Sequence, residues 1–123
     1  MKFLCLAYYD EAKMSALPEE QLQAIISKCP GYDAELKKTG RLLFSASLGE
    51  PNTTQCIRPK SGKPSFTDGP FTEAKEMIGG FFMIEAADAA EARRIASHHP
   101  AAHLGETIGW GIEVRPVDFY LDG

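Results

Sequence analysis

Two segments of this chain are apolar on both of the faces that a β-strand would present. Residues 2–9 read KFLCLAYY, and residues 77–85 read MIGGFFMIE. A strand with one face in water alternates apolar and polar residues, so both segments are expected to be strands that are covered on each side. The sequence therefore has to provide an apolar layer for each face of one sheet.

Helical periodicity occurs in two regions. Between residues 18 and 40 apolar residues recur at every third or fourth position, at Leu22, Ile25, Ile26, Cys29, Tyr32 and Leu36. Pro30 lacks an N–H and its ring clashes with the preceding turn, so we expect one bent helix whose two parts stay in phase. The second helix begins at Asp88, which has the spacing of a capping box with Glu91, and ends before Pro100.

Residues 49–71 differ from the rest of the chain because prolines and glycines are dense there. Two short extended pieces, at 54–60 and 63–67, flank Ser61 and Gly62. Proline is poorly tolerated in a central strand, so these pieces predict an edge hairpin, inserted at about residues 50–70.

Two further strands, at 41–48 and 110–117, complete two β-α-β halves within a single domain spanning residues 1–123. This order predicts an α+β ferredoxin-like sandwich with both helices on one face of the sheet. No remaining segment is available to cover the second face. We therefore expect a homodimer that packs sheet on sheet around a barrel-like interior or cleft.

Composition excludes several classes of protein. The chain has 13 Lys+Arg against 17 Asp+Glu, a net charge of -4, and its basic residues are scattered, which argues against nucleic acid as a partner. No apolar run approaches the length of a membrane span. Cys5, Cys29 and Cys56 form no CxxC and predict reduced thiols in a cytoplasmic protein. No phosphate loop or dinucleotide fingerprint is present, so no cofactor is expected.

Several motifs resemble the signature of the DGPF group within the YCII-related family. They are TDGPF at 67–71, Glu73, Lys75-Glu76, GGFF at 79–82, PAA at 100–102 and EVRPV at 113–117. The resemblance implies a ferredoxin-like dimeric α+β barrel, and some relatives are encoded beside, or fused to, extracytoplasmic-function sigma factors. The wider family is credited with a His–Asp pair as an enzyme site. Tyr32 occupies the expected position of that His after Pro30, and Tyr is a poor base at neutral pH.

Asp68 and the glycine pair are the first candidate site residues. Asp68 precedes Gly69 and Pro70, so its carboxylate either fixes a turn or faces a pocket as a base. Gly79 and Gly80 indicate a bulge or a close backbone approach, to a ligand or to a packed neighbour.

The histidines leave more than one interpretation open. His99, His103 and Glu106 have a spacing that would suit a divalent ion on a continuous helix, but Pro100 interrupts it, so no metal site is assigned. The alternatives for these histidines are capping of a helix end and a place in a ligand pocket. Arg115 is expected either to hold a carboxylate or phosphate or to pair with Glu113 or Asp68.

These residues support two hypotheses about function. The first is small-ligand binding in the cleft of a dimeric barrel, with weak enzyme activity. Asp68 or His99 would then be the general base, Arg115 would hold a small anionic ligand, and Tyr32, Gly79 and Gly80 would contact it. The second is an accessory protein that acts through protein contacts of the tail, residues 118–123, for instance with an extracytoplasmic-function sigma factor.

Overall fold

The computed structural model describes residues 1–71 and 74–123, so that Glu73 of the motif lies outside the described residues. The helices and strands follow one another as β1 (Lys2–Asp10), α1 (Glu11–Ala16), α2 (Glu19–Ile26), α3 (Cys29–Lys38), β2 (Leu42–Ser47), β3 (Gln55–Lys60), β4 (Lys63–Asp68), β5 (Glu76–Glu85), α4 (Ala89–Ala96) and β6 (Gly111–Pro116). Short 3-10 helices occupy η1 (Pro51–Thr53), η2 (Pro100–Ala102) and η3 (Glu106–Ile108).

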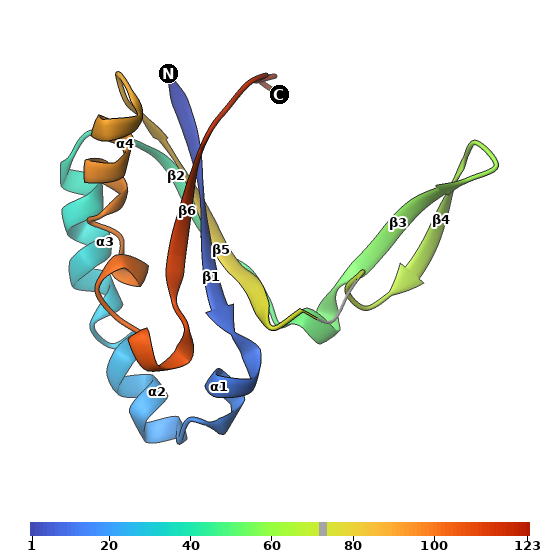
Figure 1. Ribbon diagram of the computed structural model, residues 1–123, viewed down its shortest axis with the longest axis horizontal. Helices are drawn as coiled ribbons and strands as arrows, with labels where there is room; N and C mark the ends of the chain where they lie inside the picture. Colours follow the sequence, from blue (N-terminus) through green and yellow to red (C-terminus); the bar gives the residue numbers. More distant parts are fainter. Residues whose placement is uncertain (72–73) are drawn as a thin grey trace.

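The main sheet has four antiparallel strands in the order β2-β5-β1-β6. Its two central strands, β1 and β5, are the two segments that are apolar on both faces. Helices α2, α3 and α4 lie together on one side of the sheet (Figure 1). This strand order and layering confirm the predicted ferredoxin-like α+β fold.

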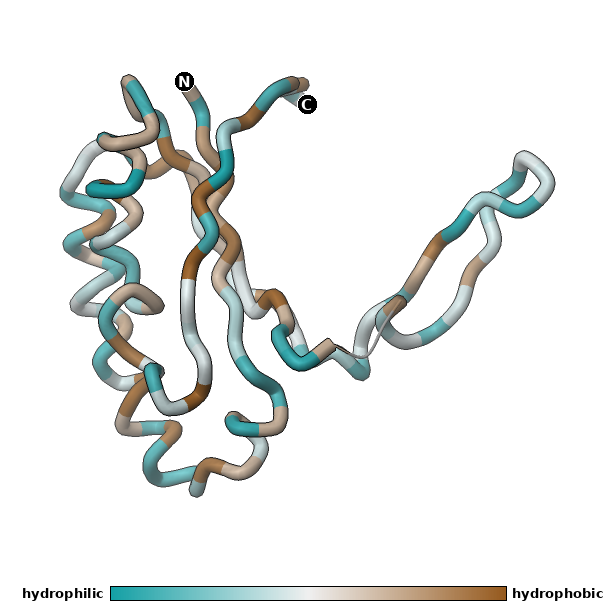
Figure 2. Tube along the Cα trace, in the orientation of Figure 1, coloured by the Kyte–Doolittle hydropathy of each residue, from teal (hydrophilic) through white to brown (hydrophobic). Residues whose placement is uncertain are grey.

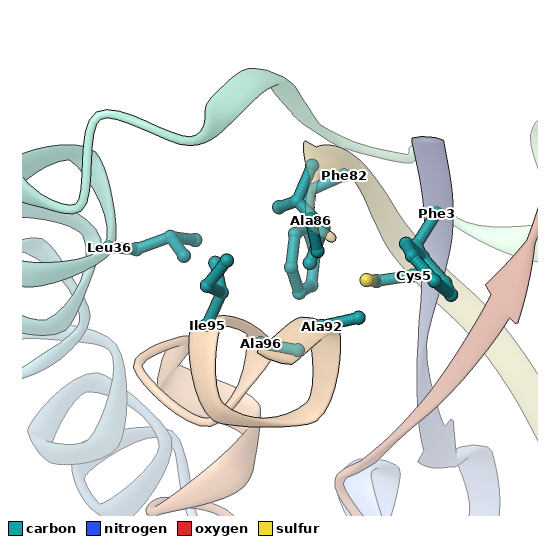
Figure 3. Close-up of a cluster of buried hydrophobic side chains, with 9 residues drawn as sticks. Phe3, Cys5, Leu36, Phe82, Ala86, Ala92, Ile95 and Ala96 are labelled. Carbon is teal, nitrogen blue, oxygen red and sulfur yellow. The ribbon is translucent and has the colours of Figure 1, made fainter. Parts of the chain in front are cut away.

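The hydrophobic core fills the space between the sheet and these helices. The strands contribute Phe3, Cys5, Phe82 and Ile84, and Leu36 from α3 faces them across the core together with Ala92, Ile95 and Ala96 from α4 (Figure 3). Alternate side chains of β1 and β5 therefore point towards the helices. Burial of this cluster is the main stabilisation of the fold.

The first helical region differs from the bent helix that the sequence predicts. It forms two helices, α2 and α3, with the break at Ser27 and Lys28 rather than at Pro30. Pro30 sits in the first turn of α3, where its missing N–H needs no partner. The additional helix α1 was not predicted; buried Asp10 caps it by accepting a hydrogen bond from the Lys13 N–H at 3.1 Å.

The start of the second helix confirms the predicted cap. Asp88 Oδ1 accepts from the Glu91 N–H at 2.8 Å. Glu91 Oε1 in turn accepts from the N–H of Ala87, at 3.2 Å, one residue before the cap. Both ends of the capping interaction are thus formed, and they fix where α4 begins.

Strands β3 and β4 form the predicted hairpin, but they do not join the edge of the main sheet. They make a separate two-stranded sheet that projects away from the rest of the chain (Figure 1). We call this hairpin, residues 55–68, the arm. Pro59 lies opposite Pro64 in it, and neither offers an N–H for further pairing.

The sheet face opposite the helices carries many apolar side chains, several of which are only partly covered. We call it the open face, and its residues include Leu4, Leu6, Phe44, Ile78, Phe81 and Met83. The hydrophobic colouring of the central strands is shown in Figure 2. Among the described residues Phe44 remains 42% and Ile78 40% exposed. The described part of the chain also holds no helix of the length and apolar character that a bilayer crossing needs.

Candidate functional site

A cavity of about 920 Å³ opens on the helix side of the sheet. Its walls come from α1, α2 and α3, from the ends of β1, β2 and β5, and from residues 48–52 and 99–101. The volume lies in the range of sites that hold a small organic molecule. The cavity is thus formed within one chain, on the opposite side of the sheet from the cleft that the sequence predicts between two copies.

His99 is a polar side chain of this cavity that two contacts hold in place. Its ring stacks on Phe82, with centroids 4.5 Å apart and planes 4° from parallel, and its Nδ1 accepts a hydrogen bond from the Ala101 N–H at 3.0 Å. Because Nδ1 is an acceptor, the neutral ring carries its proton on Nε2.

The second ring nitrogen of His99 is available to a ligand. Nε2 makes no hydrogen bond with any residue that the structure describes. Within the same residues no buried side-chain nitrogen or oxygen lacks a partner, so this Nε2 is accessible rather than sealed in the core. Since His99 lines the cavity, its N–H is a donor that a bound molecule can reach.

Burial sets the charge state of this ring. It lowers the pKa of His99 below its usual value near 6.5, and the negative charge of Asp33 opposes that shift without cancelling it. His99 is therefore neutral at pH 7. Asp33 stands on α3 at the exposed rim of the same cavity, so a donor and an acceptor share one site.

Sequence reasoning missed Asp33. It directly follows Tyr32, the residue at which a His was expected, but nothing in its local spacing marks it. The proximity to His99 arises because α3 packs against the 3-10 helix η2, more than 60 residues further along the chain.

Tyr32 lies outside the cavity lining. Its ring stacks on His103, with centroids 4.9 Å apart, and His103 Nε2 is 2.6 Å from the Ser97 carbonyl oxygen. The contacts of the His103 ring are therefore with Tyr32 and Ser97. Among the described residues no three His, Cys, Asp or Glu side chains gather as metal ligands. Glu106 lies on η3, whereas His99 and His103 flank the separate 3-10 helix η2.

Gly79 and Gly80 both line the cavity, at an irregularity in the pairing of β1 with β5. A Cβ on Gly79 would lie 2.9 Å from the ring of Tyr9, and one on Gly80 would lie 2.8 Å from the carbonyl oxygen of Ala46. The predicted bulge and close approach are therefore present, and the near neighbours belong to this chain.

The structure does not bring Asp68 or Arg115 to His99. Asp68 ends β4 in the arm and is exposed. Arg115 is exposed on β6 opposite Leu4, which places it on the open face. Within the described residues no ion pair joins Arg115 to Glu113 or Asp68. The pKa of Tyr8 is raised, mainly by its hydrogen bond to the Glu113 carboxylate. The positive charge of Arg115 opposes this shift.

All three cysteines are free thiols. Cys5 is buried, which raises its pKa to about 12, and Cys56 is buried in the arm. Cys29 is half-buried and lines the cavity, and burial raises its pKa as well. The raised pKa slows reaction of this thiol at neutral pH, and a molecule that fills the cavity is expected to shield it further.

The lowered pKa of His99 predicts a loss of stability in mild acid. The unfolded chain takes up a proton near pH 6.5 and the folded chain only at lower pH, so the unfolded state binds more protons in this window. Consequently the free energy of unfolding is expected to fall as the pH drops from about 7 towards about 5. Urea unfolding across this range measures it.

Two variants isolate the contribution of His99. His99→Gln removes the titrating ring and is expected to flatten the pH dependence. His98→Gln, at the exposed neighbouring residue, should keep the slope of the natural chain. Equal slopes for the natural chain and His99→Gln would show that the His99 ring is not held neutral by burial.

This chain is similar to a known domain family, to a curated protein and to solved structures. The model of the YCII-related domain matches residues 1–117. An uncharacterised protein of Rhizobium meliloti (strain 1021) is 28% identical over 123 residues, which cover 100% of this chain and 97% of that protein. The structure of 5-chloro-2-hydroxyhydroquinone dehydrochlorinase (TftG) from Burkholderia phenoliruptrix AC1100, in complex with 2,5-dihydroxybenzoquinone, is 17% identical and covers 92% of this chain and 91% of that chain, with a TM-score of 0.41. A structural likeness this distant carries no argument about what this chain binds.

Proposed function

The chain belongs to the YCII-related family, and from that premise we propose that it binds a small organic molecule in the cavity between its helices and its sheet. The observation that carries the proposal is the fixed ring of His99. Stacking on Phe82 and the hydrogen bond to Nδ1 hold that ring in the cavity wall, with its Nε2–H accessible. Positioning a donor in this way is what a specific binding site requires.

The walls of the cavity indicate the chemistry of the ligand. Apolar surface comes from Met14, Leu17, Leu22, Leu36, Leu42 and Trp110, and hydroxyls from Ser45 and Ser47. The charged lining residues are Glu11, Glu19, Asp33 and Glu50 against a single cation, Lys37. This balance favours an uncharged or cationic molecule with an apolar ring over an anion. A small anionic ligand at Arg115, on the open face, stays a separate prediction.

Proton transfer is the reaction that this pair of residues supports. Asp33 accepts a proton from the ligand, and the Nε2–H of His99 donates a hydrogen bond to the ligand atom that gains electron density. No other group needs to enter, and the expected activity is weak because Asp33 stands at the exposed rim. Asp33 thus takes the role of base that the sequence suggested for Asp68 or His99.

Three fragments of equal size test the ligand class: benzyl alcohol, benzylamine and benzoate. Each is titrated into the full-length chain while the alkylation rate of Cys29 by iodoacetamide is followed, because Cys29 lines the cavity and the other two thiols are buried. We expect benzyl alcohol or benzylamine to slow the alkylation. Benzoate should have little effect.

Variants then locate the binding groups. His99→Phe keeps an aromatic ring against Phe82 but removes the donor, and Asp33→Asn removes the charge of the acceptor. Each is expected to weaken binding by about tenfold. Asp68→Asn makes the same change in the arm and should bind as the natural chain does. Unchanged binding by both cavity variants, or loss of binding in Asp68→Asn, would overturn the proposal.

The state in which the site works is a homodimer formed through the open face. Support comes from the apolar residues Phe44 and Ile78, which the described part of the chain leaves 42% and 40% exposed. Membership of the DGPF group rests on the motif at 67–71, and a cytoplasmic location rests on the three free thiols. These two assignments stay predictions.

An accessory role is a second candidate, favoured by the tail. Phe119 is 78% and Leu121 80% exposed, whereas Tyr120 between them lies against the Lys2 ammonium at 4.7 Å. If the tail acts through a protein, removal of residues 118–123 abolishes binding to a purified extracytoplasmic-function sigma factor of the same genome and leaves fragment binding intact. Asp33→Asn would then weaken fragment binding and leave binding to the sigma factor intact.

A further inference from the structure

The arm is amphipathic, and the described residues leave its apolar face largely exposed; we infer that this face packs against a second copy of this chain. The inference rests on the pairing of two copies through the open face proposed above, and it adds a separate contact to that pairing. Its evidence is the residue pattern of the arm, the direction in which the arm projects and the distribution of charge.

The two faces of the arm differ sharply in chemistry. Pairing of Ile57 with Phe66, and of Pro59 with Pro64, places four apolar residues on one face. The opposite face carries Cys56, Arg58, Lys60, Lys63, Ser65 and Thr67. On the apolar face Ile57 is 59% and Phe66 72% exposed. A cross-strand pair of this type stabilises a hairpin fully only when another surface covers it.

The two strands of the arm are tied to each other at its base. The Gly69 N–H donates to the Thr54 carbonyl oxygen at 2.7 Å, and the Cys56 thiol donates to the Gly69 carbonyl oxygen at 2.8 Å. The Arg58 guanidinium lies over the ring of Phe71 at 4.2 Å. A hairpin whose strands are tied at the base, and whose apolar pair is exposed midway along them, is preorganised for contact.

The position of the arm identifies a second copy as its partner. The arm leaves the molecule on the side of the sheet that faces away from the helices (Figure 1). A second copy packed on the open face therefore lies alongside it. Two-fold symmetry gives each copy the same contact, so that two arms hold one dimer.

Charge supports the same partner. Between residues 55 and 68 the arm has three cationic side chains and one acidic side chain, a net charge of +2. Since the whole chain has a net charge of -4, the remainder of the chain holds -6. The three cations lie on the face opposite the apolar pair, so they attract the acidic body of the other copy at long range while the apolar face makes the contact.

Two double variants of the full chain test the inference by sedimentation equilibrium. Ile57→Asn with Phe66→Asn removes the apolar pair, and the dimer dissociation constant is expected to rise at least about tenfold. Ser65→Asn with Thr67→Asn places the same number of asparagines in the arm on the opposite face, and should leave that constant unchanged. Circular dichroism confirms that both double variants fold.

Photo-crosslinking gives a second measurement. Benzoylphenylalanine at position 66 should crosslink two copies of the chain, whereas the same group at position 65 should not. A dimer with an unchanged dissociation constant in both variants and no crosslink from position 66 would overturn the arm contact but leave the open-face dimer standing. A chain that is monomeric at every concentration would overturn both, and crosslinks from position 66 to parts of the same chain would show that the arm folds back.

Discussion

Replacing Phe82 with alanine is expected to lower the free energy of unfolding by about 3–5 kcal/mol. Phe82 is fully buried at the centre of β5, in the core between the sheet and the helices. Its removal leaves a cavity that neighbours from two layers cannot fill, since close-packed interiors relax only in part. Because domains of this kind are stable by about 5–15 kcal/mol, the loss is a large share of the total.

Urea unfolding of three variants measures this effect. Phe82→Leu keeps most of the apolar volume and should lose less than half as much stability as Phe82→Ala. Phe119→Ala removes the same ring from an exposed place in the tail and should stay within about 0.5 kcal/mol of the natural chain. A loss for Phe82→Ala that is no larger than that for Phe119→Ala would contradict the assigned core.

Phe82 also connects the core with the cavity. Its ring supports the ring of His99, so Phe82→Leu is expected to weaken fragment binding even while the chain remains folded. The nuclear magnetic resonance signals of the His99 ring should shift in that variant. The same residue therefore positions the site and stabilises the fold, and the milder variant separates the two roles.

The elements that the sequence predicts well are those whose signal is local and repeated. The runs at 2–9 and 77–85 mark the central strands because they lack the polar alternation of a strand with one face in water. With these two strands in the middle, the order of helices and strands leaves few topologies, and the observed order is one of them. Asp88 marks the start of α4 because its cap needs only residues within one helical turn.

The candidate site is harder to predict because tertiary packing assembles it. His99 was identified, but its partner Asp33 comes from a helix that no spacing rule connects to it. The Gly and Pro residues around Asp68 suggested a functional motif. In the structure they follow the end of β4, where the chain leaves the arm. The break between α2 and α3 was misplaced because a proline in the first turn of a helix is favourable, whereas one in the interior is not.

Phe44→Lys is expected to raise the dissociation constant of the dimer by about a hundredfold or more, because symmetry puts two uncompensated charges into an apolar interface. Phe44 lies on the open face, where its ring meets Phe81 edge-on at 5.9 Å. In a single chain Phe44 is 42% exposed, so a lysine there stays in contact with water and costs the monomer little. The effect therefore appears in assembly and not in folding.

Ile26→Lys is the matched control for this prediction. Ile26 is 41% exposed, nearly the same as Phe44, but it lies on α2, on the helix side of the sheet. Sedimentation equilibrium should find the dimer unchanged in Ile26→Lys and dissociated in Phe44→Lys at the same micromolar concentration. If both variants dissociate, helix surfaces rather than the open face join the copies. If neither dissociates, the open face is not an interface, and the apolar side chains of β1 and β5 must be tolerated in water.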